Sequence, residues 1–277
     1  MGKKLLFLLL FTIFYGFTYC QINIDANDLR NLIIKGKIQE LTVLTASQIN
    51  TPSENNEIEF QYSFDTIGNI TAKKSFYNGM VIQNEIFSYD YKGNMTKEQW
   101  FNPDNSEIFS SYTKYEYNIR GMVGIKNVYN SDSSIRKSLL YSYDEKGYLT
   151  QIHVKEYYDE GDEYSEIFNY DEKGKFINHQ IVDLNGVQIL YENFIYDEKG
   201  NIIELLSSGE EINRKLNYEY DLNGNLSKYI LESSDDEGKS LTEGIYNYDN
   251  KGNLIEEILY DNKNNPTEKR KFEYIYK

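Results

Sequence analysis

Residues that commonly carry out chemistry are scarce in this chain of 277 residues, which has two histidines, one cysteine and one tryptophan. His153 and His179 lie six and five residues after a glycine, so on regular strands they point to opposite faces of a sheet. Neither histidine comes with a serine or cysteine motif suited to nucleophilic attack. We therefore expect both histidines to be structural or solvated, and we predict no enzyme activity and no catalytic residue.

Acidic side chains are abundant, with 44 Asp and Glu against 29 Lys and Arg and a formal net charge of -15. This charge argues against a nucleic-acid partner, because an acidic chain repels phosphates. Adjacent carboxylates such as Glu256 and Glu257 face apart on a strand, whereas a glycosidase needs two carboxyls in one cleft. The acidic runs 159–163 and 235–237 lack the spaced ligands of a calcium loop, so we predict no metal and no other cofactor.

Aromatic side chains are the remaining candidates, since the chain has 27 tyrosines and 14 phenylalanines. Tyrosine and tryptophan rings can stack on sugar rings and also offer polar groups for hydrogen bonds. Most of the aromatics fall in regular rows whose burial stabilises the fold. Those outside the rows recur at the seventh to ninth position after a turn glycine, and the candidate binding residues are Tyr77, Trp100, Phe101 and Tyr129.

One repeated unit must position these residues. An aromatic residue, Asp, two variable residues and Gly occur in this order seven times, and an eighth copy has Asn in place of Asp. The first residue of such a turn accepts a backbone hydrogen bond, and Gly supplies the left-handed conformation that closes a three-residue hairpin loop. Each unit thus predicts a tight turn between antiparallel strands. The predicted turn residues are Asp65 and Gly68, Asp90 and Gly93, Asn118 and Gly121, Asp144 and Gly147, Asp171 and Gly174, Asp197 and Gly200, Asp221 and Gly224, and Asp249 and Gly252.

The residues on both sides of each turn alternate as those of strands do. A second aromatic precedes the first by two residues, and the second residue after Gly is always apolar. Eight units, with an incomplete unit at each end, predict about seventeen strands in a continuous meander. Between the units we expect looser, longer hairpin loops, such as the one at 102–105.

A sheet of this size cannot stay flat, because its native twist makes it curl. We predict an all-β fold, a repetitive antiparallel β-hairpin meander of about eight units that curls into a spiral or superhelical sheet with the aromatic rows on its inner side. The first strand is expected near 39–45, after a degenerate turn at 32–38. The residues expected to protect the last, unpaired edge strand from association are Lys269, Arg270, Lys271 and Lys277.

The first twenty residues differ from the rest of the chain. A basic start, an apolar run over 5–14 and small residues at Thr18 and Cys20 are typical of a secretory signal rather than of a membrane span. We predict cleavage after Cys20 and an exported mature chain without a membrane span; the alternative is a lipid anchor on Cys20. The predicted domains are a signal peptide at 1–20, an N-terminal lead-in at 21–34 and a repeat domain at 35–277.

The repeated Tyr-Asp-x-x-Gly-Asn-Leu sequence, followed by a strand, a Gly-bearing loop and Tyr-x-Tyr-Asp, resembles the YD or RHS repeat family over 35–277. The resemblance implies a curled β-sheet shell, as in secreted and cell-surface proteins, in polymorphic toxins that enclose a C-terminal effector, and in proteins described as sugar-binding. The residue after the turn Gly, often Arg in the family, is mostly Asn here. The chain resembles a short secreted member that lacks a toxin domain.

Together, the residues and the resemblance favour a secreted or cell-surface, non-enzymatic repeat protein that acts as a binding module. Carbohydrate is the expected ligand class. The alternative is a structural or protein-interaction scaffold of the cell envelope, or a truncated relative of an RHS toxin shell. The expected partner is therefore a glycan or a surface protein, with no nucleic acid.

The two N-terminal hypotheses are separated by the mass of the exported protein. Cleavage after Cys20 predicts a mature chain that begins at Gln21 and contains no cysteine, because Cys20 is the one cysteine of the chain. Intact-mass spectrometry should find that mass in the exported fraction. A diacylglyceryl adduct on an N-terminal Cys20 would instead establish the lipid anchor.

Overall fold

The computed structural model describes residues 38–47, 55–157, 161–209, 213–235 and 238–276. The predicted signal peptide, the lead-in and the turn at 32–38 therefore lie almost wholly outside the described residues, as do Lys277 and parts of both acidic runs. The described residues form eighteen strands. These are β1 (Ile38–Ser47), β2 (Asn55–Phe64), β3 (Ile70–Tyr77), β4 (Met80–Tyr89), β5 (Met95–Phe101), β6 (Glu107–Tyr117), β7 (Val123–Asn130), β8 (Ile135–Tyr143), β9 (Leu149–Glu156), β10 (Glu163–Tyr170), β11 (Phe176–Asp183), β12 (Gln188–Tyr196), β13 (Ile202–Gly209), β14 (Asn213–Tyr220), β15 (Leu226–Asp235), β16 (Gly238–Tyr248), β17 (Leu254–Tyr260) and β18 (Pro266–Tyr276).

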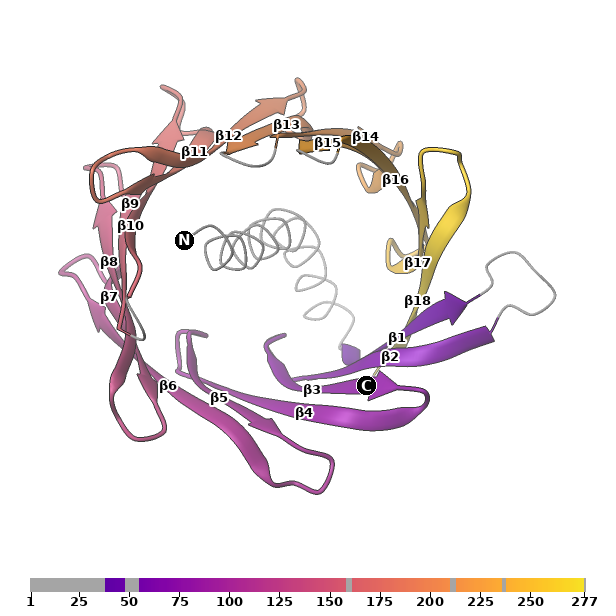
Figure 1. Cartoon of the computed structure of the whole chain (residues 1–277), viewed down its shortest axis with the longest axis horizontal. Helices are drawn as coiled ribbons and strands as arrows, with labels where there is room; N and C mark the ends of the chain where they lie inside the picture. The colour runs from indigo at the N-terminus through magenta and orange to yellow at the C-terminus, as the bar shows by residue number, and fades with distance from the viewer. Residues whose placement is uncertain (1–37, 48–54, 158–160, 210–212, 236–237, 277) are drawn as a thin grey trace.

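The strands form one closed barrel (Figure 1). Each strand pairs antiparallel with the next strand in the sequence, and β1 also pairs with β18 through eight cross-strand residue pairs. The prediction of an all-β antiparallel meander is confirmed, but the prediction of an open spiral or superhelical sheet is wrong. Closure satisfies the backbone groups that a spiral would leave unpaired along its two outer edges.

A β-bulge accompanies every predicted turn and helps to explain why the sheet closes. In the second unit, Tyr89 lies opposite Met95 and Ser88 lies opposite Lys97, so that Thr96 is an extra residue. The same register shift occurs beside the other seven turns. Because each bulge bends its strand and increases the local twist, a bulge in every unit gives the wall a steady curvature.

The basic residues near the C-terminus do not protect an edge, which corrects the prediction for them. The strand that carries them, β18, has a hydrogen-bonded neighbour on each side. Lys269 forms an ion pair with Glu256 at 3.3 Å, whereas Arg270 contacts acidic side chains on the other face. Alternation places Lys271 on the same face as Lys269. These cations take part in contacts across strands rather than in edge protection.

The tight turns are held by a repeated set of hydrogen bonds. In the first turn, one carboxylate oxygen of Asp65 accepts the backbone N–H groups of Ile67 and Asn69, both at 2.9 Å. The other oxygen accepts the side-chain amide of Asn69 at 2.8 Å. This contact explains why Asn follows the turn glycine in this chain. The Asn residues that donate to the turn Asp in this way are Asn69, Asn94, Asn201, Asn225 and Asn253.

Four hairpins at the opposite end of the barrel use the same turn geometry, so the prediction of longer, looser loops is wrong there. At 102–106, Asn102 N–H donates to the Ser106 carbonyl, and Asn105 N–H donates to the Asn102 carbonyl, both at 2.9 Å. Asn105 has a φ of 65°, a left-handed conformation that Asn tolerates better than most residues. The hairpin at 102–106 contains no glycine, so its turn was not recognised from the sequence. Equivalent bonds close the hairpins at 130–134, 183–187 and 261–265.

The aromatic rows join neighbouring units. The hydroxyl of Tyr89 on β4 donates at 2.7 Å to the carbonyl of Ile70 on the adjacent strand β3, which belongs to the preceding unit. Equivalent bonds run from Tyr115, Tyr143, Tyr196, Tyr220, Tyr248 and Tyr274 to the first residue of an earlier strand. The aromatics two residues upstream pack into the core, where Phe194, Tyr218 and Tyr246 are buried. The rows therefore combine apolar burial with satisfied hydroxyl groups.

We predict that Gly244→Ala destabilises the barrel. Gly244 on β16 lies opposite Tyr229 on β15, and a Cβ added there would lie 2.0 Å from the Tyr229 ring. Because Tyr229 is buried, the ring cannot move without disturbing its neighbours, and overpacking of this kind destabilises by about 1–3 kcal/mol. Urea unfolding should show this loss.

Gly124→Ala is the matched control. Gly124 also lies within a strand, but the nearest atom to its added Cβ is 3.5 Å away, an ordinary contact. This variant should keep or slightly raise the unfolding midpoint, because alanine reduces the entropy of the unfolded chain. Equal midpoints for the two variants would contradict the packing of Tyr229 against Gly244.

Candidate functional site in the barrel lumen

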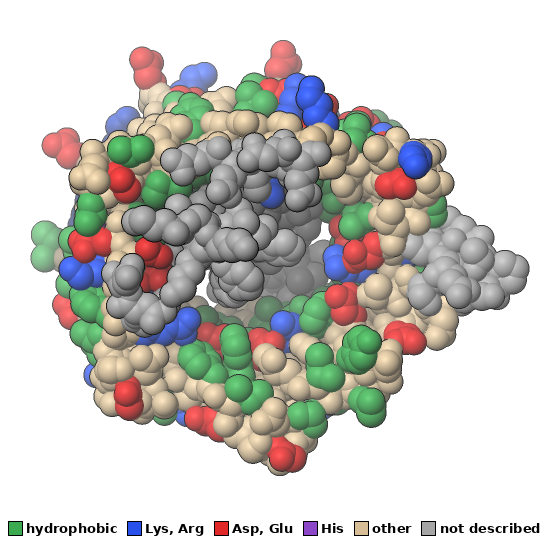
Figure 2. All heavy atoms as spheres, viewed as in Figure 1, with side chains coloured by type: hydrophobic (Ala, Val, Ile, Leu, Met, Phe, Trp, Pro, Cys, Tyr) green, Lys and Arg blue, Asp and Glu red, His purple; other side chains and the backbone are tan. Residues whose placement is uncertain are grey.

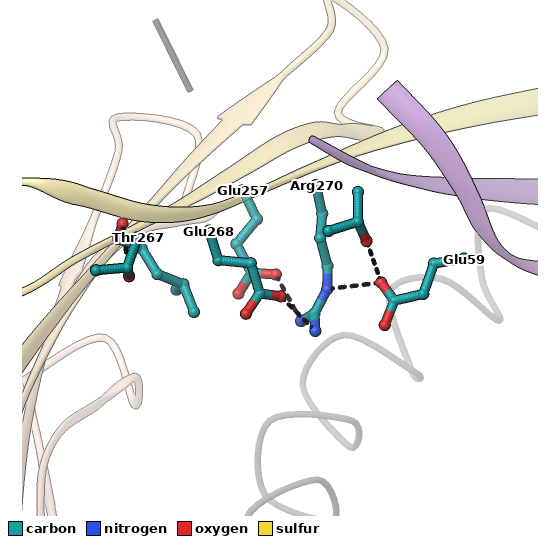
Figure 3. Close-up of polar contacts among 7 residues, drawn as sticks. Glu59, Glu257, Thr267, Glu268 and Arg270 are labelled. Atoms are coloured by element: carbon teal, nitrogen blue, oxygen red, sulfur yellow. Dashed lines mark hydrogen bonds and ion pairs between the residues drawn. The ribbon is translucent and has the colours of Figure 1, made fainter. Parts of the chain in front are cut away.

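Strand alternation and Figure 3 define the face of the sheet that lines the lumen. Figure 3 shows Arg270, Glu257, Glu268 and Glu59 extending from β18, β17 and β2 into the interior of the barrel. Arg270 shares its face with Phe272 and Tyr274, because alternate residues of a strand point to the same side. Cross-strand partners carry this assignment around the barrel. The aromatic rows therefore face the lumen, and the residues between them face outward.

The lumen of an eighteen-stranded barrel is wider than its side chains can fill. Barrels of about eight strands are filled by their own side chains, whereas barrels of sixteen to eighteen strands enclose an aqueous space. Figure 2 shows acidic and basic side chains of the described residues around the central opening of the barrel. The lumen-facing wall is therefore a surface that water and dissolved molecules can contact.

An ion cluster joins the strands on both sides of the β1–β18 junction. The Arg270 guanidinium contacts Glu59 at 3.2 Å, Glu257 at 3.4 Å and Glu268 at 2.5 Å. Glu59 also accepts the hydroxyl of Thr45 on β1. Burial lowers the pKa of Arg270, but the three carboxylates raise it by more, so the net shift of the pKa is upward. Burial raises the pKa of Glu257, although Arg270 opposes this shift. The cluster ties β17, β18, β1 and β2 together inside the lumen.

A second lumen cluster surrounds His179 on β11. Its ring lies 3.1 Å from the Glu192 carboxylate and 3.5 Å from that of Glu166, and it stacks on Phe168 with 5.0 Å between ring centroids. Burial lowers the pKa of His179, but the two carboxylates more than offset this and raise it to about 9. His179 is therefore an imidazolium at neutral pH that connects three strands.

The predicted binding aromatics do not form one site. Trp100 faces the lumen, while Phe101 and Tyr129 face outward and Tyr77 lies at the tip of β3 with 66% of its surface exposed. The Trp100 ring lies 5.0 Å from that of Phe109, at an interplanar angle of 49°. Its indole N–H donates to Glu98 at 2.8 Å. Trp100 is thus the candidate residue that the structure places in the lumen with an aromatic neighbour.

Phe109 and Glu98 are site residues that the sequence did not indicate. Both lie on the Trp100 face, because Trp100 pairs with Phe109 and Glu98 pairs with Ser111 on β6. Phe109 lies at the start of its strand, outside the aromatic rows, and Glu98 is one acidic residue among many. Only the register between β5 and β6 brings them together. The length of the hairpin between β5 and β6 sets that register, and the sequence did not predict this length.

His153 belongs to a hydrogen-bonded network on the outer face, so the prediction that the two histidines point to opposite faces is confirmed. Gln151 donates to the Ser165 hydroxyl at 3.1 Å, which leaves that hydroxyl free to donate to His153 Nδ1 at 3.2 Å. His153 Nε2 then donates to Glu163 at 3.0 Å, and Lys155 pairs with the same carboxylate. The cross-strand pair of His153 with Ser165 forms this network, which a motif search along the chain could not find.

The outer face carries ion pairs at the middle of its strands. Lys215 pairs with Glu204 at 2.9 Å, and Lys228 pairs with Glu243 at 2.9 Å. In the part of the chain that the structure describes, no helix is long and apolar enough to cross a membrane. Within the same residues, no cluster of His, Cys, Asp and Glu is arranged to hold a metal ion.

A pocket lies at the end of the barrel opposite the predicted turns. Its volume is about 860 Å³, and the residues around it come from β12 to β16 and from the hairpin between β17 and β18. None of the four predicted aromatics lines this pocket. Its lining includes Ser207, Arg214, Ser233 and Ser240.

Comparison with known proteins gives distant likenesses only. No family model and no curated protein matches the sequence. A porin-like protein from Bacteroides uniformis is 10% identical, with 86% of this chain and 98% of that chain covered and a TM-score of 0.44. A porin-like protein from Bacteroides vulgatus is 10% identical, with 72% and 96% covered and a TM-score of 0.39. The Tc holotoxin pore of Photorhabdus luminescens is 11% identical, with 76% of this chain and 16% of that chain covered and a TM-score of 0.23.

We predict that the stability of the barrel falls as the pH rises from about 6.5 through about 9. The pKa of His179 is raised from 6.5 to about 9 in the folded chain, so its stabilising contribution is complete below pH 6.5 and is lost as the imidazolium deprotonates. The loss is on the order of 1–3 kcal/mol. Urea midpoints measured between pH 6 and pH 9.5 should show it.

Two variants assign the pH dependence to the lumen histidine. His179→Gln should flatten the dependence and lower stability at pH 6, because Glu166 and Glu192 lose their buried counter-charge. His153→Gln on the outer face should keep the dependence. A slope that survives in His179→Gln would contradict the assignment.

Proposed function

We propose that this protein is an exported, non-enzymatic barrel that binds carbohydrate in its lumen. The observation that carries the proposal is the half-buried Trp100–Phe109 pair on the lumen face, with a carboxylate hydrogen-bonded to the indole. Aromatic rings beside polar groups are the usual components of a sugar site, because sugars present apolar C–H faces and hydroxyl edges.

Trp100 differs from the tyrosines of the rows in what its polar group does. The row hydroxyls donate to backbone carbonyls and hold the wall together. The Trp100 indole donates instead to Glu98, the second residue before it on the same strand. This bond fixes the orientation of the indole edge. A fixed ring is a better stacking surface, because little side-chain entropy remains to be lost on binding.

The charge on the outer wall supports a ligand site inside the barrel. A lipid-facing wall has an apolar outer band, in which a charged side chain destabilises by roughly 2–4 kcal/mol near the middle of the bilayer. Here Lys215–Glu204 and Lys228–Glu243 lie on the outer face of neighbouring strands. These two ion pairs are suited to contact with water rather than with lipid. The signal-like pattern of residues 1–20 supports export.

A protein-interaction scaffold is the second candidate, and apolar side chains on the outer face favour it. Tyr112 and Leu140 are 41% and 51% exposed, and Tyr112 pairs across the strands with Tyr129. Leu140 on β8 pairs with Ile125 on β7. These side chains would suit a contact with another protein surface.

Binding can be followed through Trp100, because it is the single tryptophan of the chain. We expect oligosaccharide binding to change its fluorescence, with a Kd in the range that calorimetry can measure. Trp100→Ala should weaken binding about tenfold or more, which corresponds to a loss of about 1.4 kcal/mol. Calorimetry is needed for this variant, because the substitution removes the fluorophore.

Phe101→Ala is the matched control, because Phe101 is the next residue and faces outward. It should bind like the unmodified protein. A broad glycan array that finds no ligand, together with unchanged Trp100 fluorescence, would overturn the carbohydrate proposal. Equal loss of affinity in both variants would indicate that Trp100 acts through the fold rather than by contact.

A further inference from the structure

We propose that the lumen site takes a carboxylated sugar, and that the Lys126 ammonium binds the carboxylate of this ligand. The inference rests on the proposed carbohydrate function and specifies its ligand class. It comes from Lys126, a lumen-facing cation that has no ion pair within the described wall and lies on β7, the strand next to the one that carries Phe109.

Lys126 lies in the middle of β7 and faces the lumen. It pairs across the strands with Tyr115 on β6 and with Leu139 on β8, and Tyr115 belongs to an aromatic row. Its ammonium group lies 5.9 Å from the centroid of the Tyr115 ring. Lys126 is half-buried, and within the described barrel wall it has no ion pair and no hydrogen bond.

Several other lumen cations have anionic partners. Lys73 pairs with Glu85 at 3.0 Å, and Lys137 pairs with Glu156 at 2.9 Å. Arg270 and His179 each contact two or more carboxylates. Carboxylates on neighbouring strands therefore neutralise these four cations. An unpaired ammonium at Lys126 differs from this pattern, and a partly buried charge without a partner is unfavourable until an anion reaches it.

The charges around Lys126 act on its ammonium group in both directions. Burial lowers the pKa of Lys126, and the neighbouring Lys137 lowers it further, while Glu98 acts in the opposite direction. Glu98 already accepts the indole N–H of Trp100. Phe109, the cross-strand partner of Trp100, and Tyr115, the partner of Lys126, lie six residues apart on β6, which is about 20 Å along the strand. An extended oligosaccharide of several residues spans this distance, with one end stacked on the indole and the other at the ammonium.

The net charge of the chain does not prevent such a ligand from binding. The formal charge of -15 slows the approach of an anion. At physiological ionic strength, however, interactions between exposed charges are screened beyond about 8 Å. The affinity inside the lumen therefore depends on the nearest groups, and Lys126 is a cation whose charge the wall does not balance.

Oligogalacturonate and its fully methyl-esterified form test this inference, because they share one sugar backbone and differ in the free carboxylates. For the unmodified protein, we expect calorimetry at low salt to give about tenfold tighter binding of the acid than of the ester. The difference should shrink as salt is added. In Lys126→Met, the acid should bind only as well as the ester, with affinity for the ester unchanged.

Lys114→Met is the matched control, since Lys114 lies on the outer face over the Tyr129 ring and carries the same charge. It should keep the preference for the acid. Equal affinity of the unmodified protein for acid and ester would overturn the role of Lys126 and leave the carbohydrate proposal standing. If neither form binds and a broad glycan array is also negative, the proposed function itself fails. A preference that persists in Lys126→Met would likewise overturn the inference.

Discussion

The pairing of β1 with β18 is the constraint on which the rest of the molecule depends. It turns a meander with two open edges into a wall with an inside and an outside, and strand alternation then assigns every side chain to one of them. Arg270 and Glu59 show how closely this junction is held, because they connect strands that are more than two hundred residues apart in the sequence. Without closure, the lumen groups would lie on an open sheet.

The lumen face of the barrel wall has two layers with different chemistry. Near the predicted turns, the lumen face is aromatic and its hydroxyl groups bond to the backbone of the preceding unit. Farther along the strands, the same face carries acidic and basic groups paired across strands, such as Lys73 with Glu85. The first layer is common to most units and maintains the wall. The second varies from unit to unit, so it is where individual residues can acquire a binding role.

Local features of the fold were predictable from the sequence, because a turn and its two strands involve contacts between near neighbours. Closure was not predictable, since it depends on the register of β1 with β18 and on the total curvature that the bulges beside the turns add around the wall. Trp100 was found from its place outside the rows, but its partners Phe109 and Glu98 needed the cross-strand register. Lys126 was not identified as a site residue from the sequence, because its position in the unit has no common residue type. The fifth residue after the turn glycine is Lys, Glu, Ile, His, Leu or Tyr in different units.

The register of β1 and β18 also shows where chain ends can lie in such a closed barrel. Ile38 lies opposite Tyr276, so the two ends of the described wall meet where one more tight turn would fit among the eight present. These two ends of the described wall thus occupy a position equivalent to that of the eight turns. A circular permutant that joins these ends and opens the chain at another turn, such as 197–200, would keep every strand pairing unchanged. The chain can therefore begin and end at any of these turns. The cyclic order of the units around the barrel stays the same, and only the unit that comes first in the sequence changes.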